Sequence, residues 1–246
     1  MTKAVNSRST TAESGHHRDL TWPEYPEPLP SPVIDNHAHL DFSDGEGSHG
    51  IDEHVAWAER VGVRGIITIG CDLPSARWTA EVMRGEHIPE EQRAFVAERL
   101  RAGVSIHPND AVNHVVSGKG RHGENLCSLE EAIAEISDLL DAPGMVTVGE
   151  TGLDWFRTSK KKPEKRDAQI QSFRMHIALA KEKGLPMQIH DRDAHRDVLD
   201  VLDAEGAPER TVFHCFSGDA EFAREALDRG AYLSFSGTST FKNAAY

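Results

Sequence analysis

Short apolar runs alternate with longer amphipathic segments from Val33 onward. Seven of these runs are rich in β-branched residues and mostly apolar, which is typical of parallel strands covered on both faces. They are VID (33–35), RGIITIG (64–70), AGVSIH (102–107), MVTVGE (145–150), LPMQIH (185–190), RTVFHCF (210–216) and AYLSFSG (231–237). We expect each run to form one strand.

Helix signals lie between the strand-like runs. Ser128 and Glu131 have the spacing of a capping box at the start of SLEEAIAEISDLLD. Pro163 precedes a long amphipathic segment that stops at Gly184, and DAEFAREALDRG stops at Gly230. Seven strand-then-helix units in order predict an α/β fold, either a (β/α) barrel or a doubly wound sheet.

Two segments depart from this rhythm. Residues 1–31 are polar and then proline-rich, which predicts a flexible or partly extended tail ahead of a domain over 32–246. Residues 113–127, NHVVSGKGRHGENLC, predict a polar surface insertion.

Composition narrows the class of protein. The formal net charge of −13 argues against broad adhesion to nucleic acid, but bound divalent ions can still make an active site locally positive. No run approaches the roughly 18 apolar residues of a membrane span, and the N-terminus lacks a secretory signal pattern. The three cysteines have no metal-type spacing. We therefore expect a cytoplasmic protein with reduced thiols and no membrane association.

Metal-donor residues occur at or near the ends of the predicted strands. In a (β/α) barrel these ends converge on one face, and histidines at positions i and i+2 of an extended segment point the same way. A single histidine at a strand end is usually structural, but donors here recur on several strands. The donors are His37 and His39 after the first strand, His107 at the third, Glu150 at the fourth, His190 at the fifth and His214 near the end of the sixth.

This donor set predicts a divalent-metal site. Nitrogen and carboxylate donors suit Zn, Mn or Mg without choosing among them. Five of these donors are expected to be ligands, which is more than the three protein ligands of one catalytic zinc, and a carboxylate can bridge two ions. They are His37, His39, Glu150, His190 and His214. We therefore expect two ions. Cys215 is expected to be a core thiol, and His16, His17, His49, His54, His114 and His122 to be solvated.

Six motifs, taken together in order and spacing, resemble those of the TatD family of metal-dependent deoxyribonucleases. They are VIDNHAHLD, GVSIHPNDA, VGETGLDWF, MQIHDRDAH, VFHCFSGD and AYLSFSGTSTFKNAA, and the resemblance covers residues 33–246. It implies a TIM-type (β/α)8 barrel of the amidohydrolase superfamily. It also implies hydrolysis of DNA phosphodiester bonds, often from the 3′ end, by water activated between two divalent ions.

The resemblance also implies residue roles. His37 and His39 would hold the first ion, His190 and His214 the second, and Glu150 would bridge both. His107 and Arg192 match positions expected to contact substrate phosphates, and Asp154, in the motif beside the metal glutamate, is expected to contact substrate too. Two alternatives stay open: Arg192 as a surface residue at a helix start, and Asp154 as a hydrogen-bond acceptor in a loop.

One family feature has no counterpart. The family's eighth strand carries an ETDSP-like or ETDAP-like motif whose aspartate completes the first metal site, whereas this sequence ends after the seventh predicted strand. We therefore expect a barrel of about seven strands. Two alternatives to a DNA hydrolase stay open: a small-molecule amidohydrolase, disfavoured because Glu150 stands where many such enzymes carry a carboxylated lysine, and an inactive, truncated family member.

Overall fold

The computed structural model describes residues 6–7, 10–11, 15, 17, 19–22, 24–43, 49–120, 123–159, 161–242 and 244. Its centre is a seven-stranded, all-parallel sheet in the order β2-β4-β5-β6-β7-β8-β9. The strands are β2 Val33–Ala38, β4 Val63–Gly70, β5 Leu100–Val104, β6 Met145–Asp154, β7 Met187–Arg192, β8 Thr211–Phe213 and β9 Tyr232–Leu233. A separate parallel pair joins β1 Asn6–Ser7 to β3 Phe42–Ser43.

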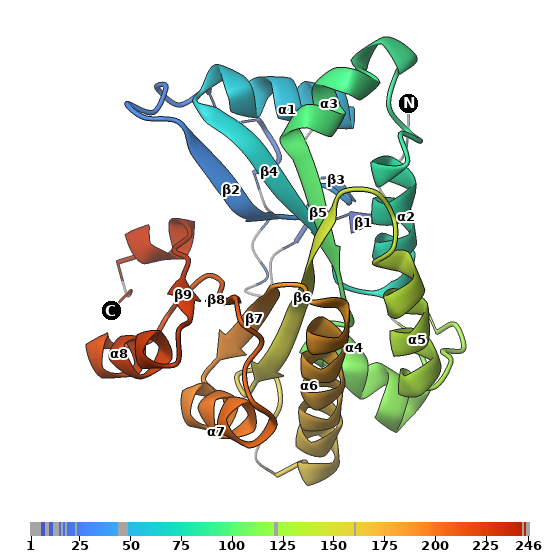
Figure 1. Cartoon of the computed structure of the whole chain (residues 1–246), viewed down its shortest axis with the longest axis vertical. Helices are drawn as coiled ribbons and strands as arrows, with labels where there is room; N and C mark the ends of the chain where they lie inside the picture. Colours follow the sequence, from blue (N-terminus) through green and yellow to red (C-terminus); the bar gives the residue numbers. More distant parts are fainter. Residues whose placement is uncertain are drawn as a thin grey trace.

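Helices follow the strands and cover the outside of the curved sheet (Figure 1). They are α1 Ile51–Arg60, α2 Leu73–Met83, α3 Arg93–Arg99, α4 Pro108–Val112, α5 Leu129–Leu139, α6 Pro163–Lys183, α7 His195–Glu205 and α8 Ala220–Asp228. Shorter turns are η1 Glu90–Gln92, the π-helical η2 Asn113–Ser117 and η3 Gly237–Thr240. The α/β class and the seven strands in TIM-barrel order confirm the prediction.

Local signals account for the helix ends. Ser128 Oγ accepts a hydrogen bond from the Glu131 backbone N–H, and the Glu131 carboxylate accepts one from the Ser128 backbone N–H, so the predicted capping box starts α5. Pro163 begins α6, and Gly184 ends it with φ +63°, a left-handed value that glycine adopts without steric cost.

The core lies between the sheet and its helices. Fully buried apolar side chains on the strands, such as Val148 and Ile189, belong to the same cluster as Phe173 and Ile177 of α6. This packing buries the sheet face that the apolar runs predict. It also fixes the carboxyl ends of the strands relative to one another.

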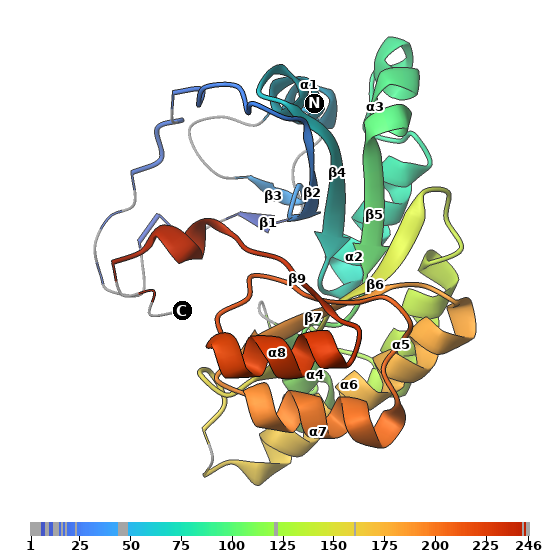
Figure 2. The same cartoon turned by 60° about the vertical axis from the view of Figure 1, so that its left-hand side comes forward.

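The sheet curls into a half-barrel whose first and last strands approach at one point. Ser234, just after β9, donates a 2.8 Å hydrogen bond to Asn36 Oδ1 on β2. Figure 2 shows the side of the molecule between these two edge strands. The contact brings the two ends of the sheet together close to His37.

Residues before β2 also contact the barrel. The Leu29 backbone N–H donates to Val61 O at 2.9 Å, and the Trp22 ring lies 6.0 Å from that of Trp57 on α1. The expectation of a flexible tail over residues 1–31 stays a prediction, and much of that range lies outside the described residues. Among the described residues, no helix is both long and apolar enough to cross a membrane.

Several predicted boundaries were wrong. β6 continues four residues past Glu150, because Thr151–Asp154 stay paired with β7. Gly149 and Gly152 have φ values of +152° and +144°, which other residues rarely adopt. Because glycines are typical of turns, the sequence did not indicate that the strand continues through them. β8 ends at Phe213 and β9 at Leu233, because Cys215 turns to φ +47° and Ser236 caps η3.

The segment 113–127 is less exposed than predicted where it begins. His114, expected to be solvated, is buried and its Nδ1 lies 2.9 Å from the Cys127 carbonyl oxygen. The hydrogen bond ties the two ends of the segment together, which the polar composition did not indicate. His49 and His54, also expected to be solvated, are half-buried among aromatic rings beside Trp57.

Candidate metal centre

The five predicted ligands meet at the carboxyl-terminal side of the sheet. His37 lies on β2 and His39 just beyond it, Glu150 lies within β6, His190 lies on β7, and His214 directly follows β8. Because all of these strands run parallel in one curved sheet, residues up to 177 positions apart share one site. We call the five residues the Glu150 cluster.

The two oxygens of Glu150 face two different groups of side chains. Oε2 lies 3.4 Å from His37 Nε2 and 3.6 Å from His39 Nε2. Oε1 lies 2.6 Å from His214 Nε2 and 2.5 Å from His190 Nδ1. The buried carboxylate thus stands between one pair of imidazoles and another.

Ligand atoms gather most tightly in two overlapping groups. In one, atoms of His37, His39 and Glu150 all lie within 4.8 Å of one another, and in the other those of His107, Glu150 and His190 do. The second group includes His107, although His214 Nε2 lies nearer to Glu150 Oε1, at 2.6 Å against 3.7 Å for His107 Nε2. His214 stays in contact with the centre, since its ring stacks on that of His37 at 3.8 Å between centroids.

Hydrogen bonds fix which nitrogen of the first two histidines is free. Gln188 donates to the Asn36 carbonyl, so its Oε1 is left to accept from His37 Nδ1. His39 Nδ1 likewise faces the Ile69 carbonyl at 3.0 Å. Both rings then carry their proton on Nδ1 and present the lone pair of Nε2 toward Glu150.

The donors fit a divalent cation. His37 Nε2 is buried and has no hydrogen-bond partner among the residues that the structure describes. A buried nitrogen lone pair without a partner is costly unless a cation or proton satisfies it. Backbone or amide hydrogen bonds on the other ring nitrogen are the usual arrangement behind a metal-binding histidine.

His107 differs from these two histidines. It lies beyond β5 and caps the short helix α4, where its Nδ1 accepts from the Asn109 backbone N–H at 3.1 Å. The prediction that it ends a strand was wrong, because Pro108 starts a helix directly after it. Its neutral ring must carry the proton on Nε2, which lies 3.7 Å from Glu150 Oε1.

Asp154 is held in a buried network beside His190. Its Oδ2 lies 3.4 Å from His190 Nε2 and accepts from Asn109 Nδ2 at 2.9 Å. Gln169 of α6 accepts from the Asp154 backbone N–H. Only 1% of Asp154 is exposed, so the structure brings it to the cluster as a neighbour of His190.

Arg192 lies at the end of β7, two residues beyond His190, and is exposed. Its guanidinium carbon lies 3.8 Å above the centre of the Phe156 ring. Among the predicted site residues, all of which the structure describes, Arg192 is the one that makes no hydrogen bond, ion pair or ring contact with Glu150 or its histidines.

Two neighbours of the cluster were not predicted. Gln188 orients His37, and its position two residues before His190 on the same strand was the available signal. Cys71, just after β4, places its Sγ 3.6 Å from Glu150 Oε2, and the end of a predicted strand was again the available signal. Burial, followed by the nearby Glu150 carboxylate, raises the pKa of the Cys71 thiol well above its usual value.

Charges within the centre are strongly coupled. Burial alone would raise the pKa of Glu150, but His214, His190 and His107 together hold it well below the usual value. Burial lowers the pKa of His107 to about 3, so this ring is neutral at neutral pH. Burial opposes the charged form of His190 too, but Glu150 and Asp154 raise its pKa to about 9. A carboxylate kept ionised in a buried site is suited to binding a cation.

Cys215 was expected to be a core thiol and is not. It is half-buried, and its Sγ lies 2.9 Å from Ser236 Oγ and 3.3 Å from Thr238 Oγ1. The left-handed turn at Cys215 ends the strand before side-chain alternation can place the thiol in the core.

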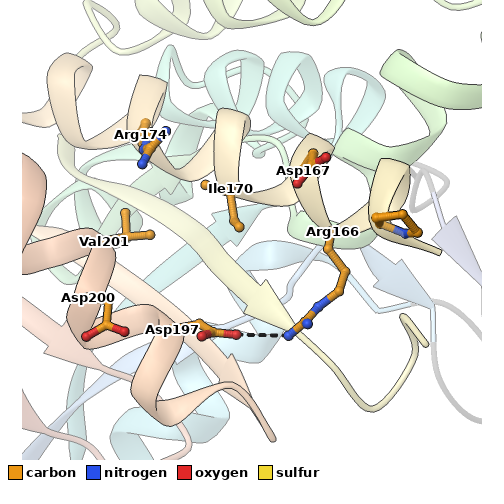
Figure 3. A pocket seen from close by; sticks show the side chains of 8 residues that line it. Arg166, Asp167, Ile170, Arg174, Asp197, Asp200 and Val201 are labelled. Carbon is orange, nitrogen blue, oxygen red and sulfur yellow. Dashed lines mark hydrogen bonds and ion pairs between the residues drawn. The ribbon is translucent and has the colours of Figure 1, made fainter. Parts of the chain in front are cut away.

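A pocket of about 380 Å³ lies outside the barrel, between α6 and α7 (Figure 3). Arg166 donates a 2.9 Å hydrogen bond to Asp197 across it. The residues that line this pocket belong to the two helices rather than to the strand ends. They include Arg166, Ile170 and Arg174 of α6 and Asp197, Asp200 and Val201 of α7.

Comparisons with known proteins agree with this geometry. Residues 34–246 match the family described as TatD related DNase. The chain belongs to the TatD family. Over 215 residues it is 36% identical to a Mycobacterium tuberculosis protein named uncharacterized metal-dependent hydrolase TatD, covering 86% of this chain and 71% of that one.

Two further relatives are informative. A Cronobacter turicensis protein named 3′-5′ ssDNA/RNA exonuclease TatD is 30% identical over 204 residues, which cover 80% of this chain and 65% of the relative. The crystal structure of a TatD family hydrolase from Entamoeba histolytica superposes with a TM-score of 0.65 at 22% identity, covering 85% of this chain and 66% of that one. Membership in this family makes the chain a metal-dependent hydrolase. Its seven-stranded half-barrel shares the fold of the Entamoeba histolytica structure.

Proposed function

We propose that the chain hydrolyses DNA phosphodiester bonds, from the 3′ end of a single strand, with two divalent ions held at Glu150. The observation that carries the proposal is the division of the Glu150 carboxylate between two sets of imidazoles. The relative named as a 3′-5′ exonuclease supports the substrate class. We place Mg, Mn or Zn in the site, because nitrogen and carboxylate donors suit all three.

Each residue has a proposed task. His37 and His39 would hold the first ion through Nε2, His190 and His214 would hold the second, and Glu150 would be a ligand of both. Ions bound at such a centre lower the pKa of a water molecule toward neutrality and polarise the phosphoryl group. The chain's own residues then position the phosphate and donate hydrogen bonds to its oxygens.

His107 and Asp154 act around the ions. His107 carries its proton on Nε2, so it can donate a hydrogen bond to a phosphate oxygen while staying neutral. Asp154 is buried against His190, so its task is to orient that ring rather than to contact the substrate directly. Arg192, exposed at the end of β7, contributes a positive charge for a neighbouring phosphate.

A nuclease assay tests the proposal. The metal-loaded chain is incubated with single-stranded DNA labelled at the 5′ or the 3′ end, with Mg, Mn or Zn added, beside a panel of amides and lactones. We expect release of 3′-terminal nucleotides that stops when a chelator removes the metal. Glu150→Gln should lose at least about a hundredfold in rate, because the substituted amide cannot bridge two cations.

The matched control is Glu182→Gln, the same change at an exposed position near the end of α6, which should hydrolyse DNA at the wild-type rate. Nucleotide release by Glu150→Gln at the wild-type rate would refute the bridging role. Cleavage of an amide or lactone but not of DNA would favour the small-molecule hydrolase.

A further inference from the structure

An exposed aromatic ring stands beside the metal centre. Phe156 follows Asp154 by two residues, and 57% of its surface is exposed, whereas Leu153 and Asp154 are buried. A phenylalanine this exposed gains little from the core. Its position just beyond the strand that carries Glu150 suggests that it contacts a bound molecule.

The turn that carries Phe156 is firmly held. The Trp155 backbone N–H donates to Arg192 O at 2.8 Å, and its indole N–H donates to Asp197 at 2.7 Å. Arg166 packs its guanidinium over the Trp155 ring at 3.8 Å and also donates to Asp197, the pair drawn in Figure 3. Trp155 is thus tied to helices α6 and α7, and the exposure of the next ring is a fixed feature of the turn.

Phe156 packs instead against Arg192. The guanidinium carbon lies 3.8 Å from the ring centroid, within the range of a cation–π contact. Arg192 and His190 are two residues apart on β7, so they share one side of the strand. Phe156 and Arg192 therefore form a flat aromatic surface and a positive charge on the side of β7 that carries His190.

We propose that Phe156 stacks on a nucleobase of single-stranded DNA while Arg192 meets the phosphate beside it. This inference rests on the proposed function. Stacking on an aromatic side chain contributes to single-strand binding with any base, because every base has a π-face. In a duplex the bases are stacked on each other, so the ring favours a single-stranded end. The net charge of −13 disfavours broad adhesion to phosphates, which makes stacking more important.

The test uses a single-stranded oligonucleotide with 2-aminopurine at its 3′ end, whose fluorescence falls when the base stacks. Binding and nucleotide release are followed together for the metal-loaded wild type, Phe156→Ala and Phe156→Trp. A second oligonucleotide replaces the terminal base by an abasic residue. We expect Phe156→Ala to bind and cleave the base-containing strand about tenfold less well, to lose the quenching, and to treat the abasic strand as wild type does. Phe156→Trp should restore both signals.

Tyr25→Ala is the matched control. Tyr25 is also exposed, at 52%, and also carries an arginine over its ring, Arg60 at 4.9 Å. Arg60 ends α1 just before β4 begins, so this pair lies at the end of the sheet opposite the Glu150 cluster. Tyr25→Ala should quench and cleave as wild type does.

The outcomes separate the two proposals. Equal losses by Phe156→Ala on both oligonucleotides, or no loss on either, would overturn stacking even if the wild type cleaves DNA. Quenching that depends on Phe156 without any nucleotide release would uphold stacking and overturn phosphodiester hydrolysis. An absence of both signals in the wild type would overturn both.

Discussion

His176 is a fully buried histidine of α6 that no sequence pattern singled out. Its Nε2 accepts from the Ile106 backbone N–H at 3.1 Å, and its Nδ1 lies 2.8 Å from the Ser172 carbonyl oxygen. This pair of partners requires the neutral ring with its proton on Nδ1, because a protonated Nε2 would face another N–H. Burial accordingly lowers the pKa of His176 to about 4.

His176 should make stability depend on pH. Its pKa is lower in the folded chain than the ordinary 6.5, so between these values the unfolded chain binds more protons. The stabilisation is therefore complete above about pH 6.5 and is lost as the pH falls toward 4, by up to about 3 kcal/mol. Urea unfolding from pH 7 to 4.5 should show a shallower loss of stability for His176→Gln than for wild type. Equal slopes would contradict this, and exposed His17→Gln should keep the wild-type slope.

At this scale the sequence predicted donors better than their partners. Five donors could be predicted because metal-donor residue types recur at strand ends, and the structure brings all five together. They are His37, His39, Glu150, His190 and His214. The roles of Gln188 and Asn109 could not be predicted, because amide side chains are common and these roles depend on contacts between residues far apart in the sequence. Cys215 and His114 were misplaced because burial there depends on a turn and on a hydrogen bond.

Among the elements, helices with strong end signals were predicted more accurately than strands. The expected starts of α5 and α6 agree with the structure, because Ser128 and Pro163 act through local geometry alone. Strand lengths depend on pairing with neighbours, so β6 extends beyond its apolar run while β8 and β9 fall short of theirs. The seven-strand order still followed from the alternation of runs and helices.

The capping box of α5 should be measurable in stability. Ser128→Ala removes the hydroxyl that accepts from Glu131 N–H, at a cost of about 1 kcal/mol. For a domain of this size, that corresponds to a fall in melting temperature of roughly 2–4 °C. Ser137→Ala, the same change inside α5, should leave the melting temperature unchanged or slightly higher. A similar fall for both variants would show that the cap is not the cause.

For the whole molecule, the arrangement of the sheet explains how an acidic chain can bind an anionic polymer. The net charge of −13 disfavours general adhesion to DNA. The half-barrel gathers four histidines around one carboxylate, where bound cations would reverse the local charge. The account therefore depends on metal binding at the Glu150 cluster more than on any surface feature.

Metal content measures this most directly. The purified chain is loaded with Mn or Zn, dialysed and analysed by mass spectrometry for ions per chain, beside Glu150→Gln and the control Glu182→Gln. The account predicts about two ions in the wild type and the control, and a clear loss in Glu150→Gln, because the bridging carboxylate serves both sites. Fewer than one ion per wild-type chain, or the same content in Glu150→Gln, would contradict it.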